Sequence, residues 1–232
     1  MMKHAIDPEF LALLDEIREE VRSTRHLTGR STLAPRVLDA FRQVPRQAFV
    51  PDGLQWAAHQ NRPLPIGHSQ TISQPFIVAL MSDLLDPQAD DVILEIGTGS
   101  GYQAAVLSRL VKQVYSLEII EELARNARRR LQGLGYANVT VGIGDGNLGW
   151  AEHAPYDGII VTAAATRVPA ALLEQLKPGG KLVIPVGDRF WGQDLRVIRK
   201  DESGHIEDRS VLPVIFVPLT GRTDLPEPEA PR

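Results

Sequence analysis

The sequence predicts an α/β fold, in which a doubly wound, mostly parallel sheet of seven strands follows an N-terminal helical cap. Short apolar runs without polar alternation recur along the chain, which is typical of parallel strands buried on both faces. Helical patterns lie between these runs, and such alternation favours parallel crossovers. The composition, 43% hydrophobic and 23% charged over 232 residues, is that of an ordinary globular protein with one core.

Three helices are expected before the sheet or at its start. Apolar residues at helical spacing predict helices over 8–21 and 35–44. A third helix is expected to begin at Pro75, because proline is favoured in a first helical turn.

Seven segments are predicted as strands, with further helices between them. The strands are 92–96, 113–117, 138–142, 156–162, 181–186, 195–200 and 210–217. The helices are 102–110, a segment from 121 to the glycines near 133 and 135, and 168–176. The polar turn at 201–204 predicts that the last two strands form an antiparallel pair that closes the sheet.

The first predicted strand opens into the most informative motif of the chain. VILEIGTGSGY at 92–102 joins a strand to a helix through three alternate glycines, which let the backbone turn sharply and approach a ligand. The P-loop lysine is missing, and Tyr102 stands where a dinucleotide motif has its third glycine. The pattern acid-x-Gly-x-Gly-x-Gly, beginning at Glu95, instead resembles motif I of the class I S-adenosylmethionine-dependent methyltransferases, which have a Rossmann-like fold.

This resemblance implies S-adenosylmethionine as cofactor and S-adenosylhomocysteine as product. The cofactor has an ammonium, a sulfonium and a ribose but no phosphate, so an acid suits it better than a lysine. Glu95 is the candidate for the ammonium group. Glu118, at the end of the next strand, is the candidate for the ribose hydroxyls, because a carboxylate accepts two charge-assisted hydrogen bonds. The alternative for Glu118 is an exposed, solvated glutamate.

Further segments are similar to one family. They are VPRQAFVP at 44–51, LPIGHSQTISQP at 64–75, GDG at 144–146, PYDGIIVTAAA at 155–165, LKPGGKLVIPVG at 176–187 and VPLTG at 217–221. With the glycine motif they resemble, in order and over about 34–221, the protein-L-isoaspartate O-methyltransferases. The chain departs from the family's pattern at His68-Ser69, where Gln-Gly is more usual.

The family resemblance implies methyl transfer to the α-carboxylate freed when an aspartyl or asparaginyl residue rearranges to an isoaspartyl linkage. Damaged proteins and peptides are the implied substrates, and the ester then cyclises to a succinimide whose hydrolysis returns some aspartate. We expect a single domain over 1–232, with a cap and substrate-covering segment at 1–75, a cofactor-binding core at 76–221 and a disordered tail at 222–232.

The resemblance also implies which residues form the site. Ser73 is the catalytic candidate, positioning the substrate carboxylate rather than acting as a nucleophile. Residues expected around the cofactor are Thr71, Ile72, Ser73, Glu95, Gly97, Thr98, Gly99, Tyr102, Glu118, Ile119, Asp145 and Gly146. Judged by residue type alone, Ser73 can instead cap the helix that begins at Pro75, and Asp145 can be a turn residue.

Composition argues against several other classes. Zero cysteines exclude disulfides and thiolate sites, and His59 and His68 fit no familiar ligand spacing, so no metal is expected. The formal charge of −4 argues against a nucleic-acid partner, and the arginines at 125–130 are interpreted as a solvated helix face. Without a signal peptide or an apolar run of membrane-spanning length, we expect a cytoplasmic monomer with no membrane partner.

Three alternatives remain open. A class I methyltransferase for another carboxylate, a small molecule or a nucleic acid shares the fold, although amino-nitrogen targets predict Asn/Asp-Pro-Pro-Tyr where 162–165 reads TAAA. A protein that binds the cofactor without catalysis would have a blocked substrate pocket. A nicotinamide oxidoreductase would need the missing third glycine.

Overall fold

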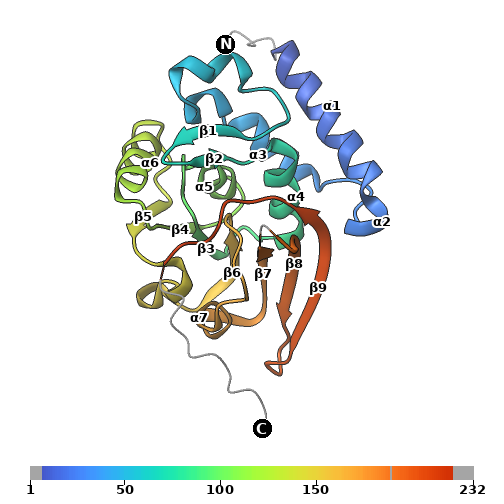
Figure 1. Ribbon diagram of the computed structural model, residues 1–232, viewed down its shortest axis with the longest axis vertical. Coiled ribbons are helices and arrows are strands. Elements are labelled where there is room, and N and C mark those ends of the chain that lie inside the picture. Colours follow the sequence, from blue (N-terminus) through green and yellow to red (C-terminus); the bar gives the residue numbers. More distant parts are fainter. Residues whose placement is uncertain (1–6, 189, 222–232) are drawn as a thin grey trace.

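The computed structural model describes residues 7–188 and 190–221 and confirms the seven-stranded α/β sheet (Figure 1). The strands are β3 (Val92–Ile96), β4 (Gln113–Glu118), β5 (Val139–Ile143), β6 (Tyr156–Val161), β7 (Leu176–Asp188), β8 (Gly192–Lys200) and β9 (Ile206–Val214). Their order across the sheet is β5-β4-β3-β6-β7-β8-β9. The pairings from β5 to β7 are parallel, and β8 is antiparallel to β7. The antiparallel pairing of β8 with β9 confirms the prediction from the turn at 201–204. The predicted tail at 222–232 lies outside the described residues.

The helices occur where the sequence predicts them, with ends that differ by a few residues. They are α1 (Pro8–Ser23), α3 (Pro35–Gln43), α4 (Pro75–Leu85), α5 (Tyr102–Ser108), α6 (Glu121–Gly133) and α7 (Ala170–Gln175), with a short α2 (Arg25–Thr28). Short 3-10 helices are η1 (Arg46–Phe49), η2 (Asp52–Ala57), η3 (Gly146–Leu148) and η4 (Ala151–His153). None of the helices in the described part of the chain is long and apolar enough to cross a membrane.

Two strands near the end of the chain differ from prediction. β7 begins at Leu176, five residues before the predicted 181–186. Leu176 pairs with Tyr156, and Lys181 pairs with Gly158, so the intervening segment with Pro-Gly-Gly forms a bulge within the strand. The last strand, predicted at 210–217, spans Ile206–Val214 in the structure. The carboxylate of Asp201 accepts the backbone N–H of Ser203 and of His205, so the turn is tight and pairing resumes at once.

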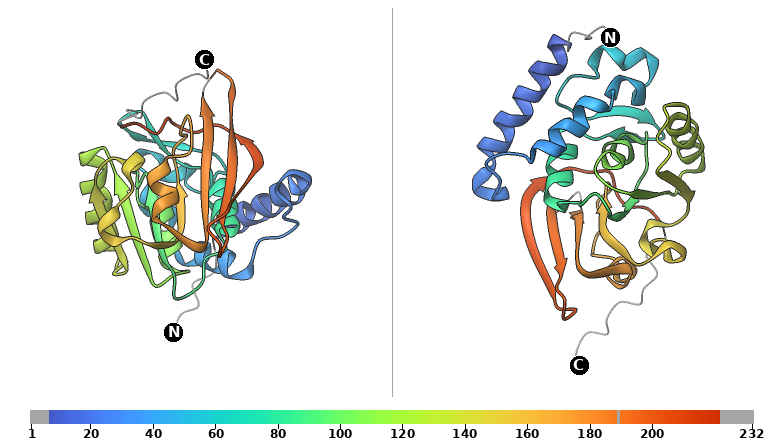
Figure 2. Two further views of the ribbon diagram at one scale, coloured as in Figure 1. Left: turned by 90° about the horizontal axis from the view of Figure 1, so that it is seen from below. Right: turned by 180° about the vertical axis from the view of Figure 1, so that it is seen from behind.

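The sheet has an apolar core on each face. Ile93 faces the larger core, which α1, α3, α4, α5 and α6 cover, whereas its neighbour Leu94 faces a smaller core closed by α7 and Trp150. Seen from behind, α1 and α3 lie beside α4 on the larger-core side (Figure 2). The N-terminal helices therefore share the main core with the sheet.

A two-stranded hairpin in the cap was not predicted. β1 (Leu64–Gly67) and β2 (Gln70–Ile72) pair through His68 and Ser69, which adopt positive φ angles of 52° and 56°. Strands this short show no usable alternation in the sequence. The hairpin lies above the carboxyl ends of the parallel strands (Figure 1), where the Nε2 atom of His68 is 3.3 Å from a carboxylate oxygen of Glu122 on α6.

Candidate active site

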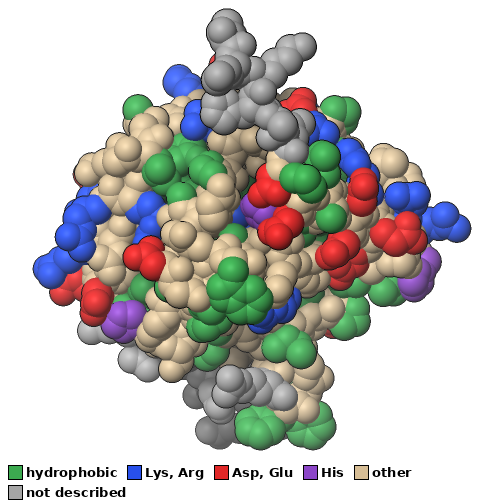
Figure 3. Space-filling view, turned by 90° about the horizontal axis from the view of Figure 1, so that it is seen from above, with side chains coloured by type: hydrophobic (Ala, Val, Ile, Leu, Met, Phe, Trp, Pro, Cys, Tyr) green, Lys and Arg blue, Asp and Glu red, His purple; other side chains and the backbone are tan. Residues whose placement is uncertain are grey.

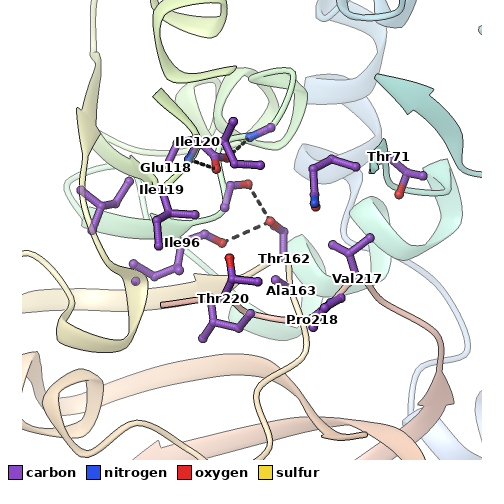
Figure 4. Close-up of a pocket in the computed structure, with 16 residues that line it drawn as sticks. Thr71, Ile96, Glu118, Ile119, Ile120, Thr162, Ala163, Val217, Pro218 and Thr220 are labelled. Atoms are coloured by element: carbon purple, nitrogen blue, oxygen red, sulfur yellow. Dashed lines mark hydrogen bonds between the residues drawn. The ribbon is translucent and has the colours of Figure 1, made fainter. Parts of the chain in front are cut away.

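A cleft opens at the carboxyl ends of the central strands (Figure 4). Its walls include Gly97 and Gly99 after β3, Glu118 after β4 and Thr162 after β6. The strand order reverses at β3, since β4 and β5 lie on one side of it and β6 and β7 on the other. Ligands of open α/β sheets bind at such a switch point, so this edge is the expected place for a cofactor.

The glycine loop 97–101 passes very close to β6. Gly97 adopts a φ of 93°, and a Cβ built on it would lie 2.4 Å from Oγ1 of Thr162. That hydroxyl donates hydrogen bonds to the carbonyls of Ile96 and Gly97, at 3.1 and 2.6 Å. A side chain at 97 would therefore displace the Thr162 hydroxyl, whose hydrogen bonds fix the loop. With glycine at 97, the backbone of the loop itself faces the cleft.

Glu118 binds this loop through its side chain. Its Oε2 accepts the backbone N–H of Gly99 at 2.8 Å, and its Oε1 accepts that of Ile120 at 3.0 Å (Figure 4). The carboxylate is buried, so the alternative of an exposed, solvated glutamate is wrong. A carboxylate has about four lone-pair positions, and Glu118 lines the cleft, so it retains the capacity to accept two ribose hydroxyls.

Glu95 does not line this cleft, contrary to the expectation that it binds the ammonium group of the cofactor. Its side chain is fully buried beneath the glycine loop, where the hydroxyl of Ser116 donates to Oε2. Ser116 also shares a hydrogen bond of 2.6 Å with the buried hydroxyl of Thr98. Burial raises the pKa of Glu95 to about 8, so the carboxyl group is mostly protonated at neutral pH. These residues form a hydrogen-bonded support under the loop.

The other predicted cofactor residues divide into two groups. Thr71, Ile119 and Gly146 line the cleft. Ile72 and Tyr102 border a smaller recess behind Ser73. The Tyr102 ring belongs to the core, since it packs edge-on against Phe49 with centroids 5.6 Å apart, and burial raises the pKa of its hydroxyl. Tyr102 is therefore a wall residue rather than a hydrogen-bonding ligand.

Asp145 caps the 3-10 turn η3. Its Oδ1 accepts hydrogen bonds from the backbone N–H and the side-chain amide of Asn147, at 2.9 and 3.0 Å. The turn interpretation is thus confirmed. Since the next residue, Gly146, lines the cleft, the cap also sets the position of the cleft wall.

Sequence reasoning missed a part of the site that follows β9. Residues 215–221, here called the C-terminal strap, run across the sheet edge (Figure 1). Both backbone groups of Ala164 bind the strap. Its N–H donates to the carbonyl of Val217 at 2.8 Å, and its carbonyl accepts the N–H of Leu219 at 2.7 Å. Cleft-lining residues that were not predicted are Gln70, Ile96, Leu117, Ile120, Thr162, Ala163, Val217, Pro218, Leu219 and Thr220. The VPLTG motif at 217–221 was the available signal.

Ser73 lies where two cavities approach each other. It lines the recess beside the glycine loop and a second cleft that shares Thr162 with the first. It does not cap α4: the N-cap is Gln74, and the backbone N–H of Phe76 binds Oδ1 of Asn61 at 3.0 Å. The capping alternative is therefore wrong. Within residues 7–188 and 190–221 the Ser73 hydroxyl makes no hydrogen bond, which leaves it available to a ligand.

Arg46 fixes the backbone at Ser73, a role that sequence reasoning did not assign. The buried guanidinium donates to the carbonyls of Ser73 and Ala58, at 3.0 and 2.7 Å, and lies 5.8 Å from the ring centroid of Tyr102. Burial lowers the pKa of Arg46 to about 10, so it remains cationic at neutral pH. The buried guanidinium thus connects the backbone at Ala58 to the backbone at Ser73.

The remaining charged candidates have structural partners. His59 lies 3.3 Å from Asp7, and His68 pairs with Glu122, so the two histidines contact separate carboxylates. On α6, Arg125 pairs with Glu121 as the helical spacing predicts. Arg130, on the same helix, donates to the carbonyl of Ser100 at 2.9 Å and supports the glycine loop.

Known proteins similar to this chain agree with its geometry. The sequence pattern of the family described as "Protein-L-isoaspartate(D-aspartate) O-methyltransferase" matches residues 22–224. A "Protein-L-isoaspartate O-methyltransferase 2" from Syntrophobacter fumaroxidans is 55% identical over 209 residues, covering 90% of this chain and 85% of the relative. A protein of the same name from Polaromonas sp. is 55% identical over 210 residues, covering 90% of this chain and 100% of the relative.

Solved structures share the fold. One described as "protein-L-isoaspartate O-methyltransferase" has a TM-score of 0.77 and 27% identity, covering 89% of this chain and 66% of that chain. Another, a Plasmodium falciparum protein in complex with S-adenosyl-L-homocysteine, has a TM-score of 0.73 and 22% identity, covering 88% and 97%. Since the family pattern spans most of the sequence and the first two relatives share more than half of the aligned residues, the chain belongs to the protein-L-isoaspartate O-methyltransferase family.

Proposed function

We propose that this protein transfers the methyl group of S-adenosylmethionine to the free α-carboxylate of L-isoaspartyl residues in damaged proteins and peptides, which initiates repair to aspartyl through a succinimide. Family membership supports the reaction and the cofactor. The observation that carries the proposal is the junction of two clefts. The first cleft has Glu118 and the glycine loop, the second has Ser73, and both include Thr71 and Thr162.

The residues of the chain have mainly to orient and desolvate the reactants. When bound, S-adenosylmethionine supplies a methyl group on a sulfonium, which is a good leaving group. The substrate carboxylate is ionised at neutral pH, so no general base is required. Ser73 donates a hydrogen bond to the non-attacking carboxylate oxygen, and the apolar strap excludes water from the attacking one.

We assign the other site residues by position. Glu118 and Ile119 bind the ribose, the backbone of Gly97 and Gly99 contacts the methionine part, and Gly146 faces the adenine, with Asp145 placed beside it by the family resemblance. Thr71 lies between the two reactants. Of the remaining predicted residues, Ile72 and Tyr102 form the back wall, and Glu95 with Thr98 supports the loop.

We also infer a monomer that acts in the cytoplasm without a nucleic-acid or membrane partner; the formal charge of −4 supports the part on nucleic acid. We infer that the single domain comprises a cap at 1–75 and a core at 76–221. This division is supported by the contribution of both parts to the cleft, through Thr71 and Glu118.

Methylation of a matched peptide pair tests the function directly. With labelled S-adenosylmethionine, we expect base-labile label on a peptide that contains isoaspartate and none on the same peptide with normal aspartate. Cofactor binding with methylation of neither peptide would leave the fold assignment standing and overturn the substrate assignment.

The variant Ser73→Ala separates catalysis from cofactor binding. We expect kcat to fall about tenfold or more, because a hydrogen bond to a charged group contributes about 1.5–3 kcal/mol, while the Kd for the cofactor stays within about twofold. Steady-state kinetics and calorimetry measure the two quantities. Ser31→Ala, at an exposed residue, is the control and should change neither. An equal loss of turnover and affinity would contradict the role of Ser73.

The variant Glu118→Ala tests the ribose contact. We expect cofactor binding to weaken by about 1.5–3 kcal/mol through loss of charge-assisted hydrogen bonds. Calorimetric titration gives the Kd, and a melting curve reports whether loss of the bonds to Gly99 and Ile120 has unfolded the loop region. Glu121→Ala, at an exposed acid close by, serves as control. Unchanged affinity would remove Glu118 from the ribose site.

The raised pKa of Glu95 predicts how stability depends on pH. The pKa is about 8 in the folded protein against an ordinary value of 4.5, so folding takes up a proton between these limits. The stabilisation is therefore present below pH 4.5 and is lost as the pH rises towards 8, with a slope of at most about 1.4 kcal/mol per pH unit. Urea unfolding of Glu95→Gln from pH 5 to 8 should show a shallower decline than the wild type. Parallel curves for the two proteins would refute an ionisable Glu95 of raised pKa.

A further inference from the structure

The second cleft is the part of the molecule that a polypeptide substrate must enter. It has a volume of about 550 Å³ and lies between α1, α4 and the C-terminal strap. Thr71, Thr162 and Val217 line both clefts, so the reacting carboxylate belongs where these residues lie. The rest of the second cleft is left for residues that flank the isoaspartyl linkage.

Glu20, on α1, is the only charged residue among the described residues that line the second cleft. Its Oε2 accepts the side-chain amides of Asn61 and Gln74, at 2.8 and 3.1 Å, and its Oε1 accepts the amide of Gln74 at 3.3 Å. Both oxygens act as acceptors only, which is the pattern of an ionised carboxylate. Neither partner carries a charge, so these bonds orient the carboxylate without neutralising it.

The surroundings of Glu20 add negative charge rather than compensating it. The sequence of α1 has five carboxylates and two arginines, and acidic side chains gather on the side of the molecule where α1 lies (Figure 3). Burial and the neighbouring Glu16 raise the pKa of Glu20, as expected of a carboxylate without a cationic partner. No ion pair is found for Glu20 within the described ranges 7–188 and 190–221.

We propose that Glu20 makes the enzyme select isoaspartyl substrates that carry a lysine or arginine close to the modified residue. A cationic side chain in the second cleft supplies the missing counter-charge, whereas an acidic one meets uncompensated repulsion. The residues that line both clefts, Thr71, Thr162 and Val217, are uncharged, so the reacting carboxylate meets no charged side chain among the residues of the junction. Glu20 lies on α1, just before residue 22, where the match to the family pattern begins. This proposal on Glu20 rests on the proposed function.

A set of isoaspartyl peptides tests this preference. The peptides differ at one position, which holds Lys, Gln or Glu, and the series is repeated for the two positions on each side of the isoaspartyl residue. We expect kcat/KM to follow the order Lys, Gln, Glu at one position or more, with Lys exceeding Glu by about three- to tenfold, the range of a partly exposed charge pair. This ratio should shrink as sodium chloride is raised, because salt screens exposed charges.

The variant Glu20→Gln separates charge from positioning. It keeps a side chain of the same shape, and we expect the Lys-to-Glu ratio to fall to within about twofold, while Glu19→Gln, at an exposed acid on the same helix, leaves the ratio unchanged. A uniform fall in kcat/KM for all peptides would show that Glu20 only supports Gln74 and would overturn the proposal. A wild-type enzyme without preference at any position would overturn it without any variant. Failure to methylate every isoaspartyl peptide would instead refute the proposed function.

Discussion

The carboxylate of Glu118 is the contact on which the geometry of the cofactor cleft depends. Two neighbouring parallel strands end here, and their loops carry backbone N–H groups that have no strand partner. Glu118 accepts one from each loop, at Gly99 and at Ile120, and so satisfies both in a buried position. Because the same carboxylate lines the cleft, one group sets the loop shape and provides the proposed ribose contact.

The backbone on the Ser73 side of the site is held by a cation, the guanidinium of Arg46. Arg46 donates to backbone carbonyls from two parts of the cap and from Ser73, whereas Glu118 accepts backbone N–H groups. With the backbone held by Arg46 and the start of α4 satisfied by Asn61, the Ser73 hydroxyl is not needed for structure. Arg46 thus fixes the backbone at Ser73 and leaves the Ser73 hydroxyl free of that task, whereas Glu118 both fixes its loops and lines the cleft.

Local pattern was sufficient to predict the seven strands of the sheet, the longer helices and the glycine loop, since strand, turn and helix signals there all lie within a short segment. It was insufficient for Glu95, because both faces of β3 are covered by apolar cores and a continuous apolar run does not reveal where each residue points. The strap is held at the cleft by its pairing with Ala164 and by the side chain of Gln193, which are contacts between distant segments. The amphipathic pattern of α1 likewise shows its buried face but not the cleft that Glu20 borders.

The distribution of charge suits the proposed reaction. A sulfonium and a carboxylate react to give neutral products, so charge disappears in the transition state, and a charged group at the reacting centre would stabilise the reactants more than the transition state. The residues shared by the two clefts, Thr71, Thr162 and Val217, are uncharged. Glu95, the acid nearest in sequence to the loop, is buried and mostly protonated at neutral pH. The carboxylates of Glu118 and Glu20 each line only one of the two clefts, so the fold provides charge for recognition on both sides and keeps it out of the junction where the methyl group moves.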